Sequence, residues 1–250
     1  MGRWLEQWSL LCNEHEETLW QWLSPLTPST FEHKTVLDAG CGNGGNASLI
    51  SKYAKHVTGI DLESTESPLL KQAGNISYRT GNLENLGIKE EYDIGFSVGV
   101  LHHLQDPDAG FYNLVNAVKP GGIVAVWVYS EEGNWFMRKI VEPVKSHFLL
   151  KLPHPLFKFI AHVSTLIGYG LAYCPLYFIK TFSWLPYFNY FKYWRSYSYD
   201  RNFMNVYDKL NAPTTHWIPK SKIVQWSEAL KNPVYSDFNR VSWRLSGIKP

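Results

Sequence analysis

The stretch VLDAGCGNGG, residues 36–45, decides the fold of this chain. A short apolar run ends in an acid, Asp38, and breaks into glycines, and a helical pattern follows from Ala47 to Ile50. Glycines at such a turn let a ligand approach the backbone, and the unpaired N–H groups at the start of a helix face that ligand. The order strand, tight turn, helix therefore predicts a nucleotide-type site.

The glycines of this turn fit two cofactor patterns. Gly40, Gly42 and Gly45 match the dinucleotide fingerprint G-x-G-x-x-G. Gly40, Gly42 and Gly44 match the pattern G-x-G-x-G equally well. The turn alone therefore leaves the cofactor open, and the rest of the chain must identify it.

The composition of the chain narrows its class. At 250 residues it is long enough for one domain with an embedded subdomain, and its formal net charge of +2 is too small to indicate a nucleic-acid partner. Cys12, Cys41 and Cys174 are far apart and lack metal-ligand spacing, so the sequence predicts neither a disulfide framework nor a metal site. The N-terminus lacks the apolar core of a signal peptide. We expect a cytoplasmic protein, and the sequence leaves its oligomeric state open.

Residues 34–128 alternate between strand and helix patterns, which predicts a doubly wound α/β fold with a mostly parallel sheet. The ligand of such a sheet lies at the carboxyl ends of its strands. After an insertion that follows the fifth strand, a helix and two closing strands complete a seven-stranded, Rossmann-like sheet. The expected strands are 36–38, 56–61, 76–80, 92–97, 123–129, 234–238 and 241–245, and the expected helices are 47–54, 68–73, 111–118 and 221–230.

Two segments stand outside this alternation. Residues 3–24 carry apolar side chains at spacings near three and four, which indicates a helical flank, and residues 131–218 are rich in aromatic side chains. Residues 159–179 contain no Lys, Arg, Asp or Glu, and that length could span a bilayer. Polar and glycine residues such as His162 and Gly168 favour instead a mostly helical insertion that covers the sheet, with a peripheral membrane contact as an alternative. The predicted parts are a helical flank (1–30), a cofactor-binding core (31–130), an aromatic-rich cap (131–218) and closing elements (219–250).

Four motifs between residues 34 and 129 resemble the core of the class I S-adenosylmethionine-dependent methyltransferases, especially their small-molecule and quinone-type branch. The motifs are VLDAGCGNG (36–44), GID (59–61), GVLHHLQDP (99–107) and KPGG (119–122). The resemblance implies S-adenosyl-L-methionine as the cofactor. The cofactor-binding residues that it implies are Asp38, Gly40, Cys41, Gly42, Gly44, Asp61, Leu62, Asn82, Leu83, Ser97, Val98 and His103.

Two acids support this cofactor. Asp38 ends an otherwise apolar strand, where a carboxylate can hold the ammonium group of the cofactor's methionine part, whereas a nicotinamide dinucleotide has no cation there. Asp61 follows the glycines by about 20 residues, the distance at which an acid accepts both ribose hydroxyls.

One position departs from the family pattern. Asn82 stands where an aspartate commonly accepts the adenine amino group; its side-chain carbonyl can still accept, and Glu84 is a substitute.

Three histidines are candidate catalytic residues. Methyl transfer is an in-line displacement that needs proximity, alignment and a deprotonated nucleophile. His102 and His103 follow the fourth strand, and because an imidazole titrates near neutral pH either could accept a proton, with His103 preferred. His216 lies where the insertion re-enters the core. The alternative is that these residues contribute only packing and backbone contacts. Adjacent histidines without a third ligand do not indicate a metal site.

The predicted function is methyl transfer from S-adenosyl-L-methionine to a small, apolar or aromatic molecule in biosynthesis, with oxygen as the acceptor atom. An aromatic-rich insertion favours flat or apolar ligands. Residues 97–101, SVGVL, lack the Asn/Asp-Pro-Pro-aromatic turn that accompanies methylation of amino groups on nucleic-acid bases. Two alternatives remain: a nicotinamide-dependent oxidoreductase that uses the same glycines, and a membrane-associated protein that binds the cofactor without catalysis.

Overall fold

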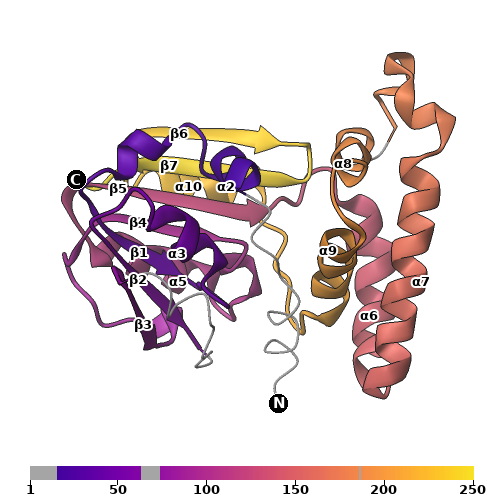
Figure 1. The fold of residues 1–250 in the computed structure, drawn as a ribbon, viewed down its shortest axis with the longest axis horizontal. Helices are drawn as coiled ribbons and strands as arrows, with labels where there is room; N and C mark the ends of the chain where they lie inside the picture. Colours follow the sequence, from indigo (N-terminus) through magenta and orange to yellow (C-terminus); the bar gives the residue numbers. More distant parts are fainter. Residues whose placement is uncertain (1–15, 63–73, 186) are drawn as a thin grey trace. The chain divides into compact units, whose positions relative to one another are not determined.

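The computed structural model describes residues 16–62, 74–185 and 187–250. Seven strands form one sheet in the order β3-β2-β1-β4-β5-β7-β6 (Figure 1). All neighbouring pairs from β3 to β5 are parallel, and β7 is antiparallel to both β5 and β6. The predicted fold class, a mostly parallel α/β sheet with a helical insertion after the fifth strand, is therefore confirmed. The strands are β1 (Thr35–Ala39), β2 (His56–Asp61), β3 (Ile76–Thr80), β4 (Tyr92–Val98), β5 (Val118–Tyr129), β6 (Lys231–Phe238) and β7 (Ser242–Ile248).

The helices that pack on the sheet lie before, between and after these strands. They are α2 (Glu16–Leu23), α3 (Gly45–Ile50), α5 (Pro107–Ala117) and α10 (Lys220–Ser227), with short turns η1 (Pro28–Phe31), η2 (Leu83–Asn85) and η3 (Leu101–His103). α2 matches the second half of the expected flank. The first half, residues 3–15, and the helix expected at 68–73 lie outside the described residues.

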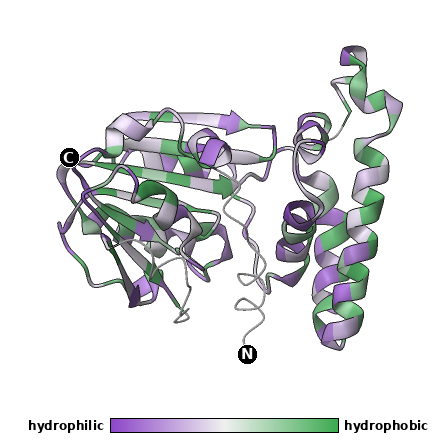
Figure 2. Ribbon diagram, in the orientation of Figure 1, coloured by the Kyte–Doolittle hydropathy of each residue, from purple (hydrophilic) through white to green (hydrophobic). Residues whose placement is uncertain are grey.

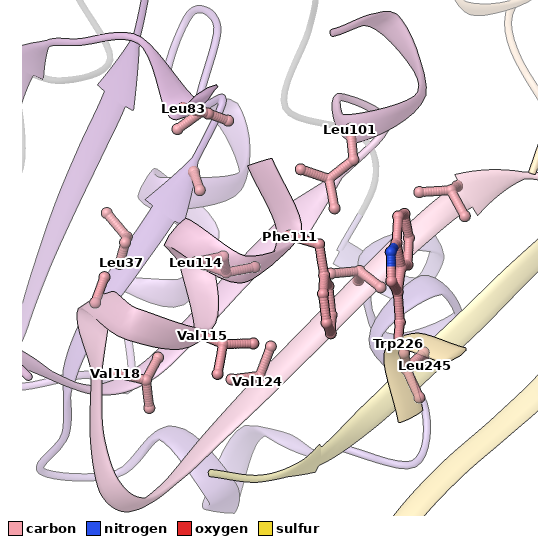
Figure 3. Close-up of a cluster of buried hydrophobic side chains, with 14 of the residues drawn as sticks. Leu37, Leu83, Leu101, Phe111, Leu114, Val115, Val118, Val124, Trp226 and Leu245 are labelled. Atoms are coloured by element: carbon pink, nitrogen blue, oxygen red, sulfur yellow. The ribbon is translucent and has the colours of Figure 1, made fainter. Parts of the chain in front are cut away.

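The sheet is buried on both faces, which explains why its central strands are apolar throughout. α5 and α10 cover one face, where Phe111 stacks on Trp226 with ring centroids 4.7 Å apart in the cluster of Figure 3. Asp108 joins the two helices, because its Oδ1 accepts from Trp226 Nε1 and its Oδ2 from Lys222 Nζ, both at 2.7 Å. α2 and α3 cover the other face over a second buried cluster that contains Phe96.

Several boundaries differ from the sequence prediction. α10 ends at residue 227, not 230, β6 begins at residue 231, not 234, and β7 spans Ser242–Ile248, not 241–245. Local hydrogen bonds account for the start of α5. α5 begins at residue 107, not 111, because the Asp106 carboxylate accepts from the N–H groups of residues 108 and 109 and Pro107 fits the first helical position. α3 ends at residue 50, not 54. The predicted start of the fifth strand at residue 123 was also wrong. β5 begins at Val118, which pairs with Tyr92, and residues 119–122 form a bulge opposite Asp93.

The insertion forms a compact unit of its own. Residues 131–213 and 239–241 belong to it, and the rest of the described chain belongs to the unit that contains the sheet. Its helices are α6 (Glu142–His147), α7 (His154–Ala172), α8 (Phe188–Trp194) and α9 (Tyr199–Asn211), joined by the short turns η4 (Met137–Val141), η5 (Leu149–Lys151), η6 (Pro175–Phe178) and η7 (Lys180–Phe182). Across the described ranges we find no helix with the length and apolarity that crossing a bilayer requires. The finer four-part division expected from the sequence stays a prediction.

Asp93 ties the amino ends of three strands together. Its Oδ2 accepts from the backbone N–H and the hydroxyl of Thr35 at 2.8 and 2.7 Å, and its Oδ1 accepts from Lys119 Nζ at 2.8 Å. Partial burial works to raise the pKa of Asp93, but the bonds from Lys119 and Thr35 outweigh it and hold the pKa at about 2. The charged form of Asp93 therefore stabilises the folded state.

We expect Asp93→Asn to lower the free energy of unfolding by about 1–2 kcal/mol at pH 7, measured by urea denaturation. The pKa of this carboxyl is lower in the folded than in the unfolded chain, so its contribution is full above about pH 5 and is lost as the pH falls toward 2. The difference between wild type and variant should fall to about half by pH 3. Glu32→Gln, at an exposed acid, is the control and should show no such pH dependence. A difference independent of pH would contradict the assigned role.

Candidate functional site

The glycine turn between β1 and α3 has the backbone geometry of a close ligand approach. Gly40, Gly42 and Gly44 have positive φ angles of 86°, 52° and 81°, whereas Gly45 does not belong to this group. The structure therefore follows the G-x-G-x-G reading of the sequence. A Cβ on Gly40 would lie 2.4 Å from Cγ2 of Val100, so only glycine lets the segment after β4 pack on this turn.

Two carboxylates meet at the carboxyl ends of β1 and β2. Asp38 is 1% exposed, and neither of its oxygens forms a hydrogen bond of standard geometry with a described residue, although the nearby backbone N–H of Ala47 acts to lower its pKa. Burial, and then the nearby charge of Asp61, raise the pKa of Asp38 to about 8. Asp61 Oδ2 accepts from the N–H of Gly42 at 2.8 Å, which fixes this acid against the turn.

The buried oxygens of Asp38 show which kind of group would fit here. A buried carboxylate without a donor is unfavourable until a cation or a proton compensates it. The ammonium of a methionine moiety supplies both a positive charge and hydrogen-bond donors. The residues present therefore fit the methionine part of S-adenosyl-L-methionine.

Cys41 and Leu62 flank these acids in different ways. The Cys41 thiol is buried, and burial together with the charges of Asp38 and Asp61 raises its pKa, so it stays protonated. It lies within the turn as a small apolar side chain. Leu62 follows Asp61 and is exposed, so its apolar side chain is accessible to a ligand at this edge.

Asn82 and Leu83 follow β3. The Asn82 side-chain oxygen accepts from the N–H of Glu84 at 2.9 Å and caps the η2 turn. An amide oxygen has two lone pairs, so a second bond to an adenine amino group is compatible with this cap. The Leu83 side chain is part of the core, which leaves its backbone as the part that could contact a cofactor. Glu84, the expected substitute, accepts from the N–H of Asp106 at 2.6 Å.

Ser97 and Val98 end β4 beside the turn. The Ser97 hydroxyl is buried and donates to the Ala39 carbonyl at 2.8 Å, so its side chain links β4 to β1. Val98 is half-buried. The bond from Ser97 to Ala39 is a structural contact that the sequence analysis did not predict.

The structure brings the three candidate histidines together. The segment 214–216, which follows the insertion, pairs with η3: His216 N–H donates to the His102 carbonyl at 2.7 Å, and His103 Nδ1 lies 2.8 Å from the Thr214 carbonyl oxygen. A carbonyl can only accept, so His103 carries a proton on Nδ1, and in the neutral imidazole the lone pair is then on Nε2. That is the form a proton acceptor requires.

His102 differs from its neighbours. It is fully buried, and its Nδ1 accepts from the N–H of Tyr129 at 3.3 Å, so it holds the end of β5. His216 Nε2 is buried and makes no hydrogen bond within the part of the chain that the structure describes. These contacts favour a structural role for His102. They leave His103 and His216 as the candidates for contact with a reacting group.

An aromatic cluster surrounds these histidines, and most of it was not predicted. Trp127 lies 5.1 Å from Trp22 and 5.4 Å from Tyr129, and Tyr129 stacks on Trp217 at 5.7 Å between ring centroids. His102 lies 4.2 Å from Tyr129. Side chains alternate between the two faces of a strand, so residues 127 and 129 of β5 lie on the same face. This alternation is the sequence signal that groups Trp127 with Tyr129.

The described residues contain no group of three or more His, Cys, Asp or Glu side chains that could hold a metal ion. The candidate site consists of two parts. One is the glycine turn with Asp38 and Asp61, and the other is the histidine and aromatic cluster at the ends of β4 and β5.

Comparison with known proteins finds its matches in the same region of the chain. Residues 37–126 match the family model described as a methyltransferase domain. The chain is 34% identical over 107 residues to a ubiquinone biosynthesis O-methyltransferase from Hydrogenovibrio crunogenus, covering 40% of this chain and 43% of that protein. It is also 34% identical over 121 residues to a tRNA U34 carboxymethyltransferase from Shewanella halifaxensis, covering 41% of this chain and 34% of that protein. The chain thus spans less than half the length of these relatives.

The fold extends beyond the matched region. A crystal structure described as a SAM-dependent methyltransferase from Thermotoga maritima superposes over 99% of this chain and 94% of its own, with a TM-score of 0.55 and 11% sequence identity. At this identity the likeness concerns the fold alone. The family match and the relatives that share it identify residues 37–126 as a methyltransferase domain of the S-adenosylmethionine-dependent kind.

Proposed function

We propose that this protein transfers a methyl group from S-adenosyl-L-methionine to an oxygen atom of a small, aromatic or apolar acceptor. The observation that carries the cofactor part of the proposal is the buried Asp38 carboxylate, whose oxygens form no hydrogen bond of standard geometry with a described residue and have no cation beside them. A cationic cofactor supplies the missing partner, and a nicotinamide dinucleotide has no cation to place there.

When bound, the cofactor would supply an activated methyl group on a positively charged sulfur, for transfer to the acceptor oxygen with S-adenosylhomocysteine as the leaving product. The chain's contribution is to position the reactants and remove the hydroxyl proton. Asp38 would hold the ammonium, and Asp61, fixed by Gly42, would accept from the ribose hydroxyls. His103 would take the proton on Nε2, because Thr214 fixes its other nitrogen as a donor.

The cluster around Tyr129 supports an aromatic acceptor. Aromatic side chains form favourable contacts with flat ligands, and here Trp127 meets Tyr129 edge to face while Trp217 stacks on Tyr129, so the three rings form one aromatic surface. The indole nitrogens of Trp127 and Trp217 are buried and make no hydrogen bond to any described residue. They could donate to oxygen atoms of an acceptor such as a hydroquinone or a catechol.

The names of the relatives bear on the choice of acceptor atom. A relative over the same domain carries the name ubiquinone biosynthesis O-methyltransferase, which supports oxygen as the acceptor atom. The second relative is named for a tRNA substrate, so similarity alone does not select the acceptor. The aromatic cluster favours the small molecule. A cytoplasmic location with peripheral membrane contact through the insertion stays a prediction.

The proposed role of Asp38 predicts opposite effects on binding and stability. Asp38→Asn should weaken binding of S-adenosylhomocysteine, which retains the ammonium, by roughly tenfold or more, because a charge-assisted hydrogen bond contributes about 1.5–3 kcal/mol. The same change removes a buried charge without a donor, so the thermal midpoint of the free protein at pH 9 should not fall. Asp93→Asn is the matched control, with lower stability and unchanged affinity. Calorimetric titration and thermal unfolding give both quantities. Stabilisation of the wild type by NAD or NADP but not by S-adenosylhomocysteine would refute the proposed cofactor.

Binding should also release a proton. The pKa of Asp38 is raised to about 8 in the free protein, so at pH 7 most molecules carry the proton that an ammonium partner would displace. Titrations at pH 7 in buffers of different ionisation enthalpy should therefore show release of about one proton for each S-adenosylhomocysteine bound, and release should approach zero by pH 9. Asp38→Asn should abolish the release. Equal proton release by this variant would assign the proton to another group.

The role of His103 predicts a loss of rate without a loss of cofactor. With S-adenosyl-L-methionine and a panel of catechols and hydroquinones, His103→Gln should lower kcat by about a hundredfold at pH 7, because general base catalysis contributes about 10²–10⁴. Affinity for S-adenosylhomocysteine should change little. His147→Gln, at an exposed histidine, serves as the control. If His103→Gln retained the wild-type kcat toward a catechol or hydroquinone that the wild type methylates, proton transfer to His103 would be excluded.

A further inference from the structure

The long helix α7 of the insertion has two apolar sides, of which one is used in folding. The inner side packs on α8 and α9: the Phe157 ring lies 5.3 Å from the Tyr207 ring, and Gly168 leaves room for Trp194, which a Cβ would meet at 2.2 Å. The buried residues of this side are Phe157, Ala161, Thr165, Gly168 and Ala172.

The outer side of α7 is apolar and exposed. Six large apolar side chains recur on it at helical spacing, and Phe159, Leu166 and Ile167 are 63, 60 and 61% exposed. A helix at the surface of a globular protein normally presents polar residues on this side. Figure 2 shows hydrophobic residues recurring along α7. We define the α7 outer face as Leu156, Phe159, Val163, Leu166, Ile167 and Leu171.

The exposed apolar surface is concentrated in this part of the chain. Among the described residues, 22 large apolar side chains are exposed, and 17 of them lie between residues 135 and 199. They include Trp184, at 69% exposure, in the segment after α7. Exposed tryptophans of this kind suit a boundary between water and lipid, because the ring is apolar and its N–H is polar.

The same segment is predominantly basic. Residues 133–199 contain eight Lys and Arg residues and one acid, Glu142, in a chain whose formal net charge is only +2. Glu142 is already paired with the buried Lys145 at 2.7 Å. The exposed lysines of the segment, none of which forms a salt bridge with a described residue, are Lys139, Lys151, Lys180 and Lys192.

From these observations we infer that the α7 outer face and the lysines of its segment dock on the surface of an anionic lipid bilayer. Apolar side chains enter the boundary between head groups and acyl chains, and lysines contact anionic head groups. A second copy of this chain would bring two segments of net positive charge together, which disfavours self-association. A nucleic acid would use the charge but leave Leu, Ile and Val side chains without partners. The helix lies on the bilayer, in agreement with its limited apolarity.

Vesicle flotation tests this inference with the full chain. Wild type should float with mixed phosphatidylcholine/phosphatidylserine vesicles and much less with pure phosphatidylcholine, and added salt should weaken the binding. Phe159→Ser/Leu166→Ser/Ile167→Ser should lose at least about tenfold in partition coefficient, because each buried apolar side chain adds favourable transfer energy. Lys151→Gln/Lys180→Gln should lose roughly fivefold for each lysine. The thermal midpoint should not change, because these side chains are exposed.

Matched substitutions on the sheet unit serve as controls. Val234→Ser removes an exposed apolar side chain, and Lys55→Gln/Lys89→Gln removes exposed lysines, and none of these changes should affect flotation. Equal binding to both vesicle types, or full binding by either insertion variant, would overturn the inference. A wild-type dimer that becomes monomeric in the serine variant, without flotation, would assign the face to self-association. Binding to tRNA that is lost in the lysine variant, without flotation, would assign it to nucleic acid. Because flotation needs no cofactor or acceptor, its failure is distinguishable from a failure of the proposed methyl transfer.

Discussion

The burial of the Asp38 carboxylate is the constraint on which the candidate site depends. β1 lies between β2 and β4, and both faces of the sheet are covered, so a side chain at the end of β1 cannot turn to solvent. The chain places an acid there, supplies no hydrogen bond of standard geometry from the described residues, and sets a second acid, Asp61, near it. Such an arrangement is unfavourable in the empty protein and becomes favourable with a cation, which is how a site can select a charged cofactor.

The central strands and the acids could be predicted because their signals are local and share one geometric rule. Parallel strands end at the same edge of a sheet, so the acids that end the first two strands had to lie close together. In the structure Asp38 pairs in register with Gly59, two residues before Asp61. The start of β5 could not be predicted in this way. Residues 119–122 have the composition of a turn, and only their pairing opposite Asp93 makes them a bulge within a strand.

The histidine and aromatic cluster shows a second limit of sequence reasoning. His103 and Thr214 are 111 positions apart, and the insertion lies between them. Their contact follows from the way the chain returns: Ser130 at the end of β5 forms a parallel bridge with Ile218, so the insertion leaves and rejoins the sheet at adjacent points. The candidate histidines were identified by type and by motif. Their grouping, and the presence of Trp22 and Trp217 beside them, required the long-range pairing.

The insertion also changes how the composition should be used. A formal charge of +2 for the whole chain is the sum of a basic segment, 133–199, and an acidic remainder, so the total conceals two parts of opposite net charge. Hydropathy behaves similarly. Residues 159–179 resemble a membrane span because α7 is apolar on two sides, one packed on α8 and α9 and one exposed. α7 includes Lys158 and ends at residue 172, so the uncharged run 159–179 extends beyond this helix. Within α7, the apolar side chains of one side pack on α8 and α9, and those of the other side form the exposed α7 outer face.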